Sequence, residues 1–270
     1  MEVTRILVVF DPTTDKQPAL ARAHEFAREE GCEVLLFSCI HSELPKSDAR
    51  ETEVERLVAA QKDIVEAATA PLVADGLKVT VEVEWKKDWY QAVVDASARY
   101  SVDAVFKASH RHSATQRLFK KTSDWTLIRQ CECAVLLVKS QREDSRRRVL
   151  VAVDLRRGKD TYEEINKSIF EFCKHYSSIS SPEIHFLNAY KDLPSRPDRG
   201  SMIRACGVES EFVHIKMGEP GKVIVESANE LDVDLVVIGN SARTGLAATV
   251  NNNTAELVLD HLQCDLLVIP

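Results

Sequence analysis

The sequence predicts an α/β protein built from two repeated domains, each a doubly wound parallel sheet of five strands with helices on both faces. Three observations lead to this prediction. Short apolar runs alternate with longer amphipathic segments, which is typical of a parallel sheet covered by helices. The order of segments in the first half recurs in the second. The length of 270 residues is enough for two domains of ordinary size.

The repeat is clearest in the first strand of each half. Residues 5–11 read RILVVFD and residues 148–154 read RVLVAVD, so both are a basic residue, five apolar residues and an aspartate at an offset of 143 (154 − 11). Two later pairs of segments repeat at an offset of 131, namely 103–106 with 234–237 and 134–138 with 265–269. We therefore expect two homologous domains, at residues 1–142 and 146–270, joined by the polar stretch KSQREDSRRR.

Each half contains five predicted strands. In the first half they lie at 5–11, 34–41, 78–85, 103–108 and 134–139. In the second half they lie at 148–154, 183–190, 210–217, 234–239 and 265–270. The segments between them are long enough for helices, which predicts five strand–helix units in each half.

The helix that begins near Asp48 has the clearest amphipathic pattern. Its apolar residues recur at the spacing of one helical face: Val54, Leu57, Val58, Ile64, Val65, Ala68 and Leu72. The second half has less room for an equivalent helix. Residues 35–41 align with 184–190 at an offset of 149, and the third strands align at 131, so 18 residues (149 − 131) are missing there.

The shortened segment also contains Pro194 and Pro197, which disfavour a helix. We expect the uncovered sheet face to form an apolar groove or a homodimer contact near four residues: Ile184, Phe186, Phe212 and Ile215. The alternative is that residues 191–207 fill the gap with Met202 and Ile203.

Composition excludes several classes of protein. A formal net charge of −7 argues against a nucleic-acid partner. No run approaches the roughly 20 apolar residues that a membrane span requires, and the N-terminal residues lack the pattern of a signal peptide, so we expect a cytoplasmic protein without a membrane partner. Seven cysteines without a Cys-x-x-Cys pair are typical of reduced packing residues.

A ligand site is predicted at the carboxyl ends of the first and fourth strands of the second half. In a doubly wound sheet, ligands bind where the winding direction reverses. If the strand order is 3-2-1-4-5, Asp154 and Gly239 face the same crevice. The loop after Gly239 carries Asn240 and Arg243 and leads to the three asparagines 251–253.

The asparagines have two explanations, and the sequence leaves both open. Asn253 and Glu256 have the spacing of a capping box at a helix start. Alternatively, the free backbone amides of Asn252, Asn253 and Thr254 bind an anion at the helix N-terminus.

The chain resembles the universal stress protein family over nearly all of its 270 residues, and its repeat is similar to the tandem members of that family. The resemblance implies a Rossmann-like fold and an intrachain pseudo-dimer in which strands 134–139 and 265–270 pair across a pseudo-twofold axis. It also implies a G-x-x-G-x9-G-S/T loop that holds the phosphates of ATP. The resemblance further implies that an aspartate at the end of the first strand contacts the nucleoside.

Gly239 matches the first motif glycine, whereas the other three motif positions fall on Ala242, Asn252 and Asn253. The resemblance therefore implies that ATP, another nucleotide or another phosphorylated small molecule binds at Asp154, Gly239, Asn240, Arg243, Asn252, Asn253 and Thr254. The corresponding segments of the first half, 108–113 and 120–125, keep no motif glycine. We interpret the first half as a degenerate, structural domain.

No catalytic motif or metal-binding motif is present. The sequence contains no G-x-S-x-G, H-E-x-x-H or G-x-x-x-x-G-K-S/T, and His110 and His112 have no third ligand at a recognisable spacing. Asp11 and Asp154 are equally consistent with strand-end caps. The sequence favours a non-catalytic stress-response protein with a nucleotide site in its second half. The alternatives are a ligand-free interaction scaffold and a weak nucleotide hydrolase.

Overall fold

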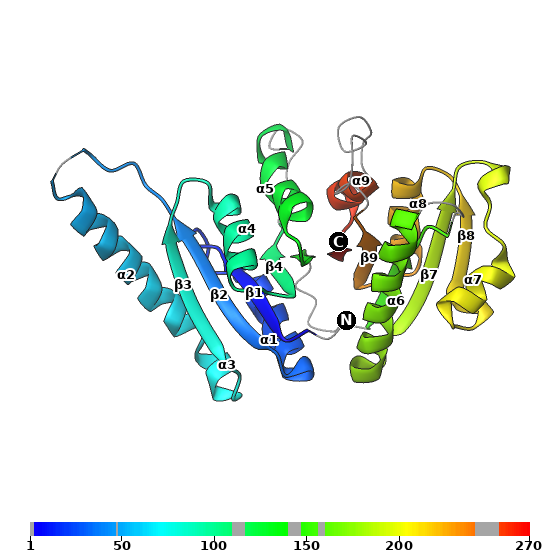
Figure 1. Ribbon diagram of the computed structural model, residues 1–270, viewed down its shortest axis with the longest axis horizontal. Helices are drawn as coiled ribbons and strands as arrows, with labels where there is room; N and C mark the ends of the chain where they lie inside the picture. The colour runs from blue at the N-terminus through cyan, green and yellow to red at the C-terminus, as the bar shows by residue number, and fades with distance from the viewer. Residues whose placement is uncertain (1–2, 47, 110–116, 140–146, 156–159, 241–253) are drawn as a thin grey trace. The chain divides into compact units, whose positions relative to one another are not determined.

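A computed structural model describes residues 3–46, 48–109, 117–139, 147–155, 160–240 and 254–270 (Figure 1). The chain divides into two compact units, Val3–Val138 and Lys139–Pro270, the latter counted with the first two residues. The limits 1–142 and 146–270 stay a prediction, because residues 140–146 lie outside the described part.

The first unit is a five-stranded parallel sheet with helices between its strands. In chain order it contains β1 (Arg5–Phe10), α1 (Pro18–Glu30), β2 (Glu33–Ile40), α2 (Arg50–Ala68), α3 (Ala70–Ala74), β3 (Val79–Trp85), α4 (Trp89–Arg99), β4 (Ala104–Ala108), α5 (Arg117–Gln130) and β5 (Ala134–Val138). Its strand order is β3-β2-β1-β4-β5.

The second unit repeats this plan. It contains β6 (Arg148–Ala152), α6 (Asp160–Ser180), β7 (Glu183–Tyr190), the 3-10 turn η1 (Leu193–Ser195), α7 (Arg199–Cys206), the 3-10 turn η2 (Ser210–Phe212), β8 (Val213–Met217), α8 (Pro220–Glu230), β9 (Leu235–Gly239), α9 (Thr254–His261) and β10 (Asp265–Ile269). Its strand order is β8-β7-β6-β9-β10. The predicted fold class and the order 3-2-1-4-5 are confirmed for both halves.

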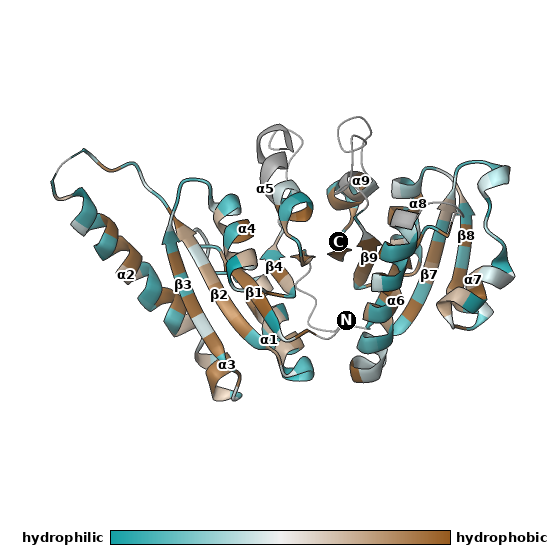
Figure 2. Cartoon of the chain, viewed as in Figure 1, coloured by the Kyte–Doolittle hydropathy of each residue, from teal (hydrophilic) through white to brown (hydrophobic). Residues whose placement is uncertain are grey.

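The apolar strands form the core of each unit. Ile6, Leu7 and Val8 of β1 are completely buried, as are Leu150 and Val151 of β6. In Figure 2 the strands are largely hydrophobic, whereas the outer surfaces of the helices are largely hydrophilic. Because crossovers between parallel strands are right-handed, the first two connections lie on one face of each sheet and the last two on the other. The helices of the later connections pack on each other, α4 on α5 and α8 on α9.

The pairing registers correct the predicted alignment by one residue. Arg5 pairs with Glu33, and its equivalent Arg148 pairs with Glu183, so the second strands align at an offset of 150 (183 − 33) rather than 149. In the third strands, Val83 and Ile215 pair with the equivalent residues 38 and 188, which gives an offset of 132 (215 − 83). The number of missing residues is still 18 (150 − 132).

Two details of the predicted elements are wrong. Ile64 was placed on the buried face of α2, but its side chain is 55% exposed, whereas Val65 is completely buried. The helix packs mainly on β3 and β2, and Val65 is the one residue of α2 that is buried, so its buried stripe is narrow. The strand predicted at 210–217 begins at Val213, because residues 210–212 form η2.

The helix expected to be missing from the second half is present in a short form. α7 begins after Asp198, whose carboxylate accepts a hydrogen bond from the Ser201 amide at 2.6 Å, and is followed by Gly207 in the left-handed conformation (φ 67°). Met202 of α7 is completely buried. The alternative in which residues 191–207 help to fill the gap is therefore the one that the structure supports.

The four apolar residues predicted to share one sheet face do not share it. Phe186 contacts Phe170 of α6, with ring centroids 5.9 Å apart, whereas Phe212 contacts His185 at 5.3 Å. His185 and Phe186 are consecutive in β7, so their side chains point to opposite faces. Phe212 therefore lies on the face opposite to Phe186.

Candidate functional site

A cavity of about 250 Å³ lies at the carboxyl ends of β6, β7 and β9. β6 and β9 are neighbours in the sheet, and the connections that follow them lie on opposite faces. This is the switch point at which doubly wound sheets bind ligands. Its apolar lining includes Val153, Ile165, Ile169, Leu187, Ile224 and Ile238. Its polar lining includes Asp154, Tyr162, Asn166, Tyr190, Lys191 and Asp192.

Asp154 lines the cavity at the end of the first strand, where its backbone is held by Asn166 of α6. The Asn166 side-chain amide donates to the Asp154 carbonyl oxygen at 2.7 Å, and its Oδ1 accepts from the Asp154 amide at 3.4 Å. Asn166 is buried. The short amide side chain thus fixes the direction in which the chain leaves β6.

The first half has the same arrangement at Asp11. Gln17 donates to the Asp11 carbonyl oxygen at 2.7 Å and accepts from its amide at 3.1 Å. The Asp11 carboxylate accepts from the Thr13 amide at 2.9 Å and from the Thr13 hydroxyl at 2.6 Å. Asp11 is therefore a cap for its own loop.

Gly239 is the last residue of β9 and also lines the cavity. A Cβ atom at this position would lie 2.1 Å from Cγ2 of Ile165 in α6, so only glycine allows the helix to approach the strand so closely. Packing alone therefore accounts for glycine at this position, whether or not a ligand binds.

The N-terminus of α9 reaches the same cavity. Thr254 and Ala255, its first two residues, are both part of the lining. Amides at a helix start attract anions. The structure thus brings together Asp154, Gly239 and Thr254 from the predicted site.

The other predicted site residues lie elsewhere or outside the described part. Asn240 is 2% exposed, its amide donates to the Ile269 carbonyl oxygen at 2.8 Å, and it is not part of the cavity lining. Arg243, Asn252 and Asn253 fall within residues 241–253, which the structure does not describe. The capping-box explanation needs Asn253 and so also falls outside the described residues.

Sequence reasoning missed several cavity residues. Tyr162 and Asn166 come from α6, and Tyr190, Lys191 and Asp192 come from the end of β7. Lys191 pairs with Glu219 at 2.9 Å. The available signal was position: Tyr190 ends the second strand of the half, Lys191 and Asp192 follow it directly, and the carboxyl ends of parallel strands lie at one edge of the sheet.

In the first half, charged side chains fill the equivalent position. At the offset of 131, Lys107 and Asp124 correspond to Ile238 and Ala255 (238 − 107 and 255 − 124). The Lys107 ammonium lies 2.7 Å from the Asp124 carboxylate, which also accepts from the Ser109 hydroxyl at 2.7 Å. Asp124 and Ser109 are buried. A charged pair thus lies where the second half has small or apolar cavity walls.

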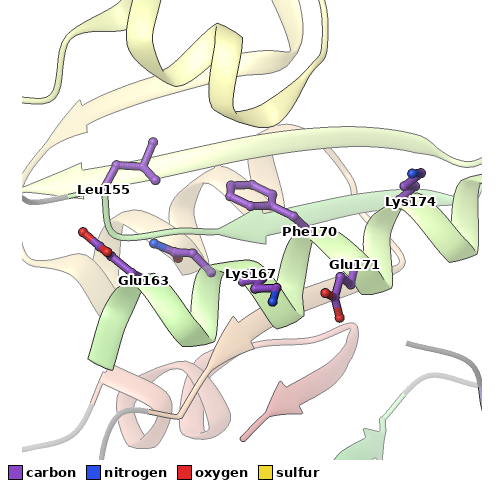
Figure 3. Close-up of a pocket in the computed structure, with 7 residues that line it drawn as sticks. Leu155, Glu163, Lys167, Phe170, Glu171 and Lys174 are labelled. Carbon is purple, nitrogen blue, oxygen red and sulfur yellow. The ribbon is translucent and has the colours of Figure 1, made fainter. Parts of the chain in front are cut away.

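A second concavity, an open groove of about 410 Å³, runs along α6 (Figure 3). Leu155 and Phe170 supply its apolar surface, and in Figure 3 the Phe170 ring points from the helix toward the sheet. The charged residues along it are Glu163, Lys167, Glu171 and Lys174. An apolar groove was expected, but it lies beside α6 rather than over Phe212 and Ile215.

The cysteines are thiols in both halves. None of the seven forms a disulfide; Cys32, Cys131, Cys173 and Cys264 are buried, and the others are half-buried. Burial raises the pKa of the Cys173 thiol and of the Cys264 thiol to about 12. Such thiols are poor nucleophiles at neutral pH, which agrees with a packing role.

Neither a metal cluster nor a membrane span occurs in the described part of the chain. Among those residues, no group of three or more His, Cys, Asp or Glu side chains is arranged to hold a metal ion. His110 and His112 lie outside them. Within the same residues, no helix combines the length and apolar character needed to cross a bilayer.

Comparison with known proteins identifies relatives that are similar to this chain over nearly its whole length. Universal stress protein E of Photorhabdus laumondii is 29% identical over 98% of this chain and 94% of its own length. The Escherichia coli K12 protein of the same name is 28% identical over 98% of this chain and 93% of its own. A universal stress protein structure from Archaeoglobus fulgidus has a TM-score of 0.76 at 17% identity, covering 98% of this chain and 95% of that chain.

The family comparison covers both halves. The model of the universal stress protein family matches residues 2–139 and 193–270, which is well over half of the sequence. The part between the two matches, 140–192, contains β6, α6 and β7, whose place in the second sheet nevertheless repeats that of β1, α1 and β2. The chain belongs to the universal stress protein family.

Proposed function

We propose that the chain is a non-catalytic, cytoplasmic stress-response protein that binds one nucleotide, or another phosphorylated small molecule, in its second half. The observation that carries this proposal is the cavity at the switch point, which is lined by Asp154, Gly239 and Thr254. Family membership supports the role in stress response.

The lining of the cavity suits the parts of a nucleotide. Its volume of about 250 Å³ is just below the roughly 300–1,000 Å³ of typical ligand pockets, so the proposal places only the nucleoside inside it, with the phosphates extending from it. Aliphatic walls favour a flat base. The Asp154 carboxylate is a suitable acceptor for a sugar hydroxyl, and Lys191 and the N-terminus of α9 are suitable partners for phosphate oxygens.

The proposal is for one site per chain. In the first half, the Lys107–Asp124 pair occupies the position that corresponds to the cavity wall, and the Asp11 carboxylate accepts two hydrogen bonds from Thr13. A buried ion pair is costly to break, because each charge would lose its partner in a poorly solvated place. We therefore expect no nucleotide in the first half.

Calorimetric titration with ATP, ADP and AMP tests the proposal. We expect one site per chain, with Asp154→Ala weakening binding at least tenfold and Asp11→Ala, its matched control, leaving binding unchanged. A ligand that binds only the folded state also raises the melting temperature, which gives an independent measure. Equal effects of the two substitutions would contradict the asymmetric site.

Two alternatives have distinct outcomes in the same experiments. A protein-interaction scaffold is favoured by the loss of three of the four loop-motif positions, at Ala242, Asn252 and Asn253. It predicts no heat of binding and no change in melting temperature with any nucleotide. A weak nucleotide hydrolase predicts release of inorganic phosphate from ATP that Asp154→Ala abolishes.

A further inference from the structure

Two histidines face each other on neighbouring strands of the second half, and neither of them lines the cavity. His185 is in β7 and His214 is in β8, and Nδ1 of the first lies 3.1 Å from Nε2 of the second. Both are near the amino ends of their strands, whereas the cavity is at the carboxyl ends. His185 is buried and His214 is half-buried, so solvent reaches the pair through His214.

Glu183 determines which ring nitrogens carry protons. Its carboxylate lies 2.9 Å from Nε2 of His185 and 2.6 Å from Nε of Arg148. An ionised carboxylate only accepts hydrogen bonds, so we assign the proton of His185 to Nε2, and in the neutral ring Nδ1 then keeps a lone pair that can accept a hydrogen bond. With this assignment, Nδ1 of His185 accepts a hydrogen bond from Nε2 of His214 across the separation of 3.1 Å.

The first half shows which part of this arrangement the fold itself requires. Arg5 and Glu33 form the same cross-strand ion pair at 2.7 Å, so the pair of Arg148 and Glu183 is common to both domains. The histidines are not. By register their equivalents are Leu35 (185 − 150) and Glu82 (214 − 132). A sheet of this kind therefore folds without two imidazoles at these positions.

We propose that Nδ1 of His185 and Nε2 of His214 bind one divalent first-row transition-metal ion, with Zn²⁺ as the probe and water completing its coordination. In a tetrahedral site with metal–nitrogen bonds of about 2.0–2.1 Å, two ligand nitrogens are about 3.3 Å apart, close to the observed separation. Binding moves the His214 proton from Nε2 to Nδ1, so both rings stay neutral. Imidazole is a preferred ligand of Zn²⁺, Cu²⁺ and Ni²⁺.

The surroundings support a metal at this place. Histidine ligands usually donate their second ring N–H to a carboxylate, which is the role that Glu183 already has for His185. The cationic side chains around the pair are engaged: Arg148 pairs with Glu183, Lys216 pairs with Glu230, and Arg199 donates to the Ser210 carbonyl oxygen at 2.7 Å. With two protein ligands rather than three, the affinity is expected to be moderate.

Titration with Zn²⁺ under reducing conditions, followed by NMR of the imidazole nitrogens, tests the proposal. The NMR readout separates this site from the seven thiols. We expect Nδ1 of His185 and Nε2 of His214 to shift together. His185→Leu copies the first half, and His214→Gln keeps an N–H donor for the hydrogen bond without a second imidazole. Both should lower affinity at least tenfold, and Glu183→Gln by about 10-fold to 100-fold.

The control is His24→Ala, which removes an imidazole held by a carboxylate of the first half, Asp75 at 2.9 Å, and should leave the shifts unchanged. Metal-dependent shifts confined to other histidines would overturn the proposal, as would equal affinity in the His214→Gln variant or no Zn²⁺ binding at these nitrogens. The nucleotide cavity shares none of these residues, so the outcome is independent of nucleotide binding.

Discussion

At the scale of single residues, Gly239 shows that packing can require a residue that also matches a ligand-binding motif. Gly239, the last residue of β9, is the one position of the loop motif at which this chain has the expected residue, and it lines the cavity. A Cβ atom at this position would clash with Ile165 of α6, however, so packing also requires a glycine. A large side chain at position 239 would therefore disturb the packing of α6. Loss of ligand binding in such a variant would not show that the ligand contacts Gly239.

This contact predicts a non-additive pair of substitutions. Gly239→Ala should lower the free energy of unfolding by about 1–3 kcal/mol, because the new methyl overlaps the Ile165 side chain. Ile165→Ala removes that methyl group, so the double variant should lose less stability than the sum of the two single variants. Urea denaturation of the four proteins measures the difference. Additive losses would show that Ile165 does not cause the requirement for glycine.

Glu33 predicts a pH dependence in the first half. Lys78 and then Arg5 hydrogen-bond to this carboxylate and lower its pKa. A lowered folded-state pKa contributes stability that is present above the ordinary glutamate pKa of about 4.3 and is lost as the pH falls through the folded value. Glu33→Gln should therefore destabilise the protein at pH 7 and have no effect once the wild-type carboxyl is protonated.

Denaturation of wild type and Glu33→Gln across this pH range measures the effect. The control is Glu55→Gln, which makes the same charge change on an exposed position of α2. A difference between wild type and Glu33→Gln that is constant with pH would rule out the ion pairs as its source.

At the scale of secondary-structure elements, α7 is the main departure from the repeat. It replaces the α2–α3 segment of the first half with a single short helix, although 18 residues (150 − 132) are missing. The N-cap Asp198 and the C-cap Gly207 determine where this short helix begins and ends. Met202 anchors it to the sheet next to β8.

The burial of Met202 predicts a large stability loss on truncation. Met202→Ala should lower the free energy of unfolding by about 2–5 kcal/mol, because it leaves a cavity under α7. Leu193→Ala removes a side chain that is 71% exposed in the same connection, and should change stability by less than about 0.5 kcal/mol. Thermal denaturation compares the two. Similar effects would mean that α7 does not cover the core.

The elements were predictable from sequence to the extent that they depend on local pattern. Strands such as β1 and β6 are continuous apolar runs, and these are recognised without knowledge of the fold. The start of β8 was not predictable, because η2 is formed by residues that also suit a strand. The cavity residues Tyr162 and Asn166 were missed because they depend on which face α6 turns to the sheet. Ile165, which packs against Gly239, lies on that face.

At the scale of the whole molecule, the two halves share a fold but differ in what fills the switch point. Lys107 and Asp124 form a charged pair in the first half, whereas Ile238 and Ala255 line a cavity in the second. The sequence predicted that the first half is degenerate from its missing glycines. That prediction is untested, but the ion pair supports it with side chains brought together from a strand and a helix.

Exchanging these residues between the halves tests the account most directly. The double variant Ile238→Lys/Ala255→Asp places the charged pair of the first half in the second, on a backbone of the same topology. Its matched control, Lys107→Ile/Asp124→Ala, removes the pair from the first half and leaves the cavity untouched. Calorimetric titration with the nucleotide that binds wild type best should show no binding to the first variant and unchanged binding, at one site per chain, to the control. Wild-type affinity in a folded Ile238→Lys/Ala255→Asp variant would contradict the account.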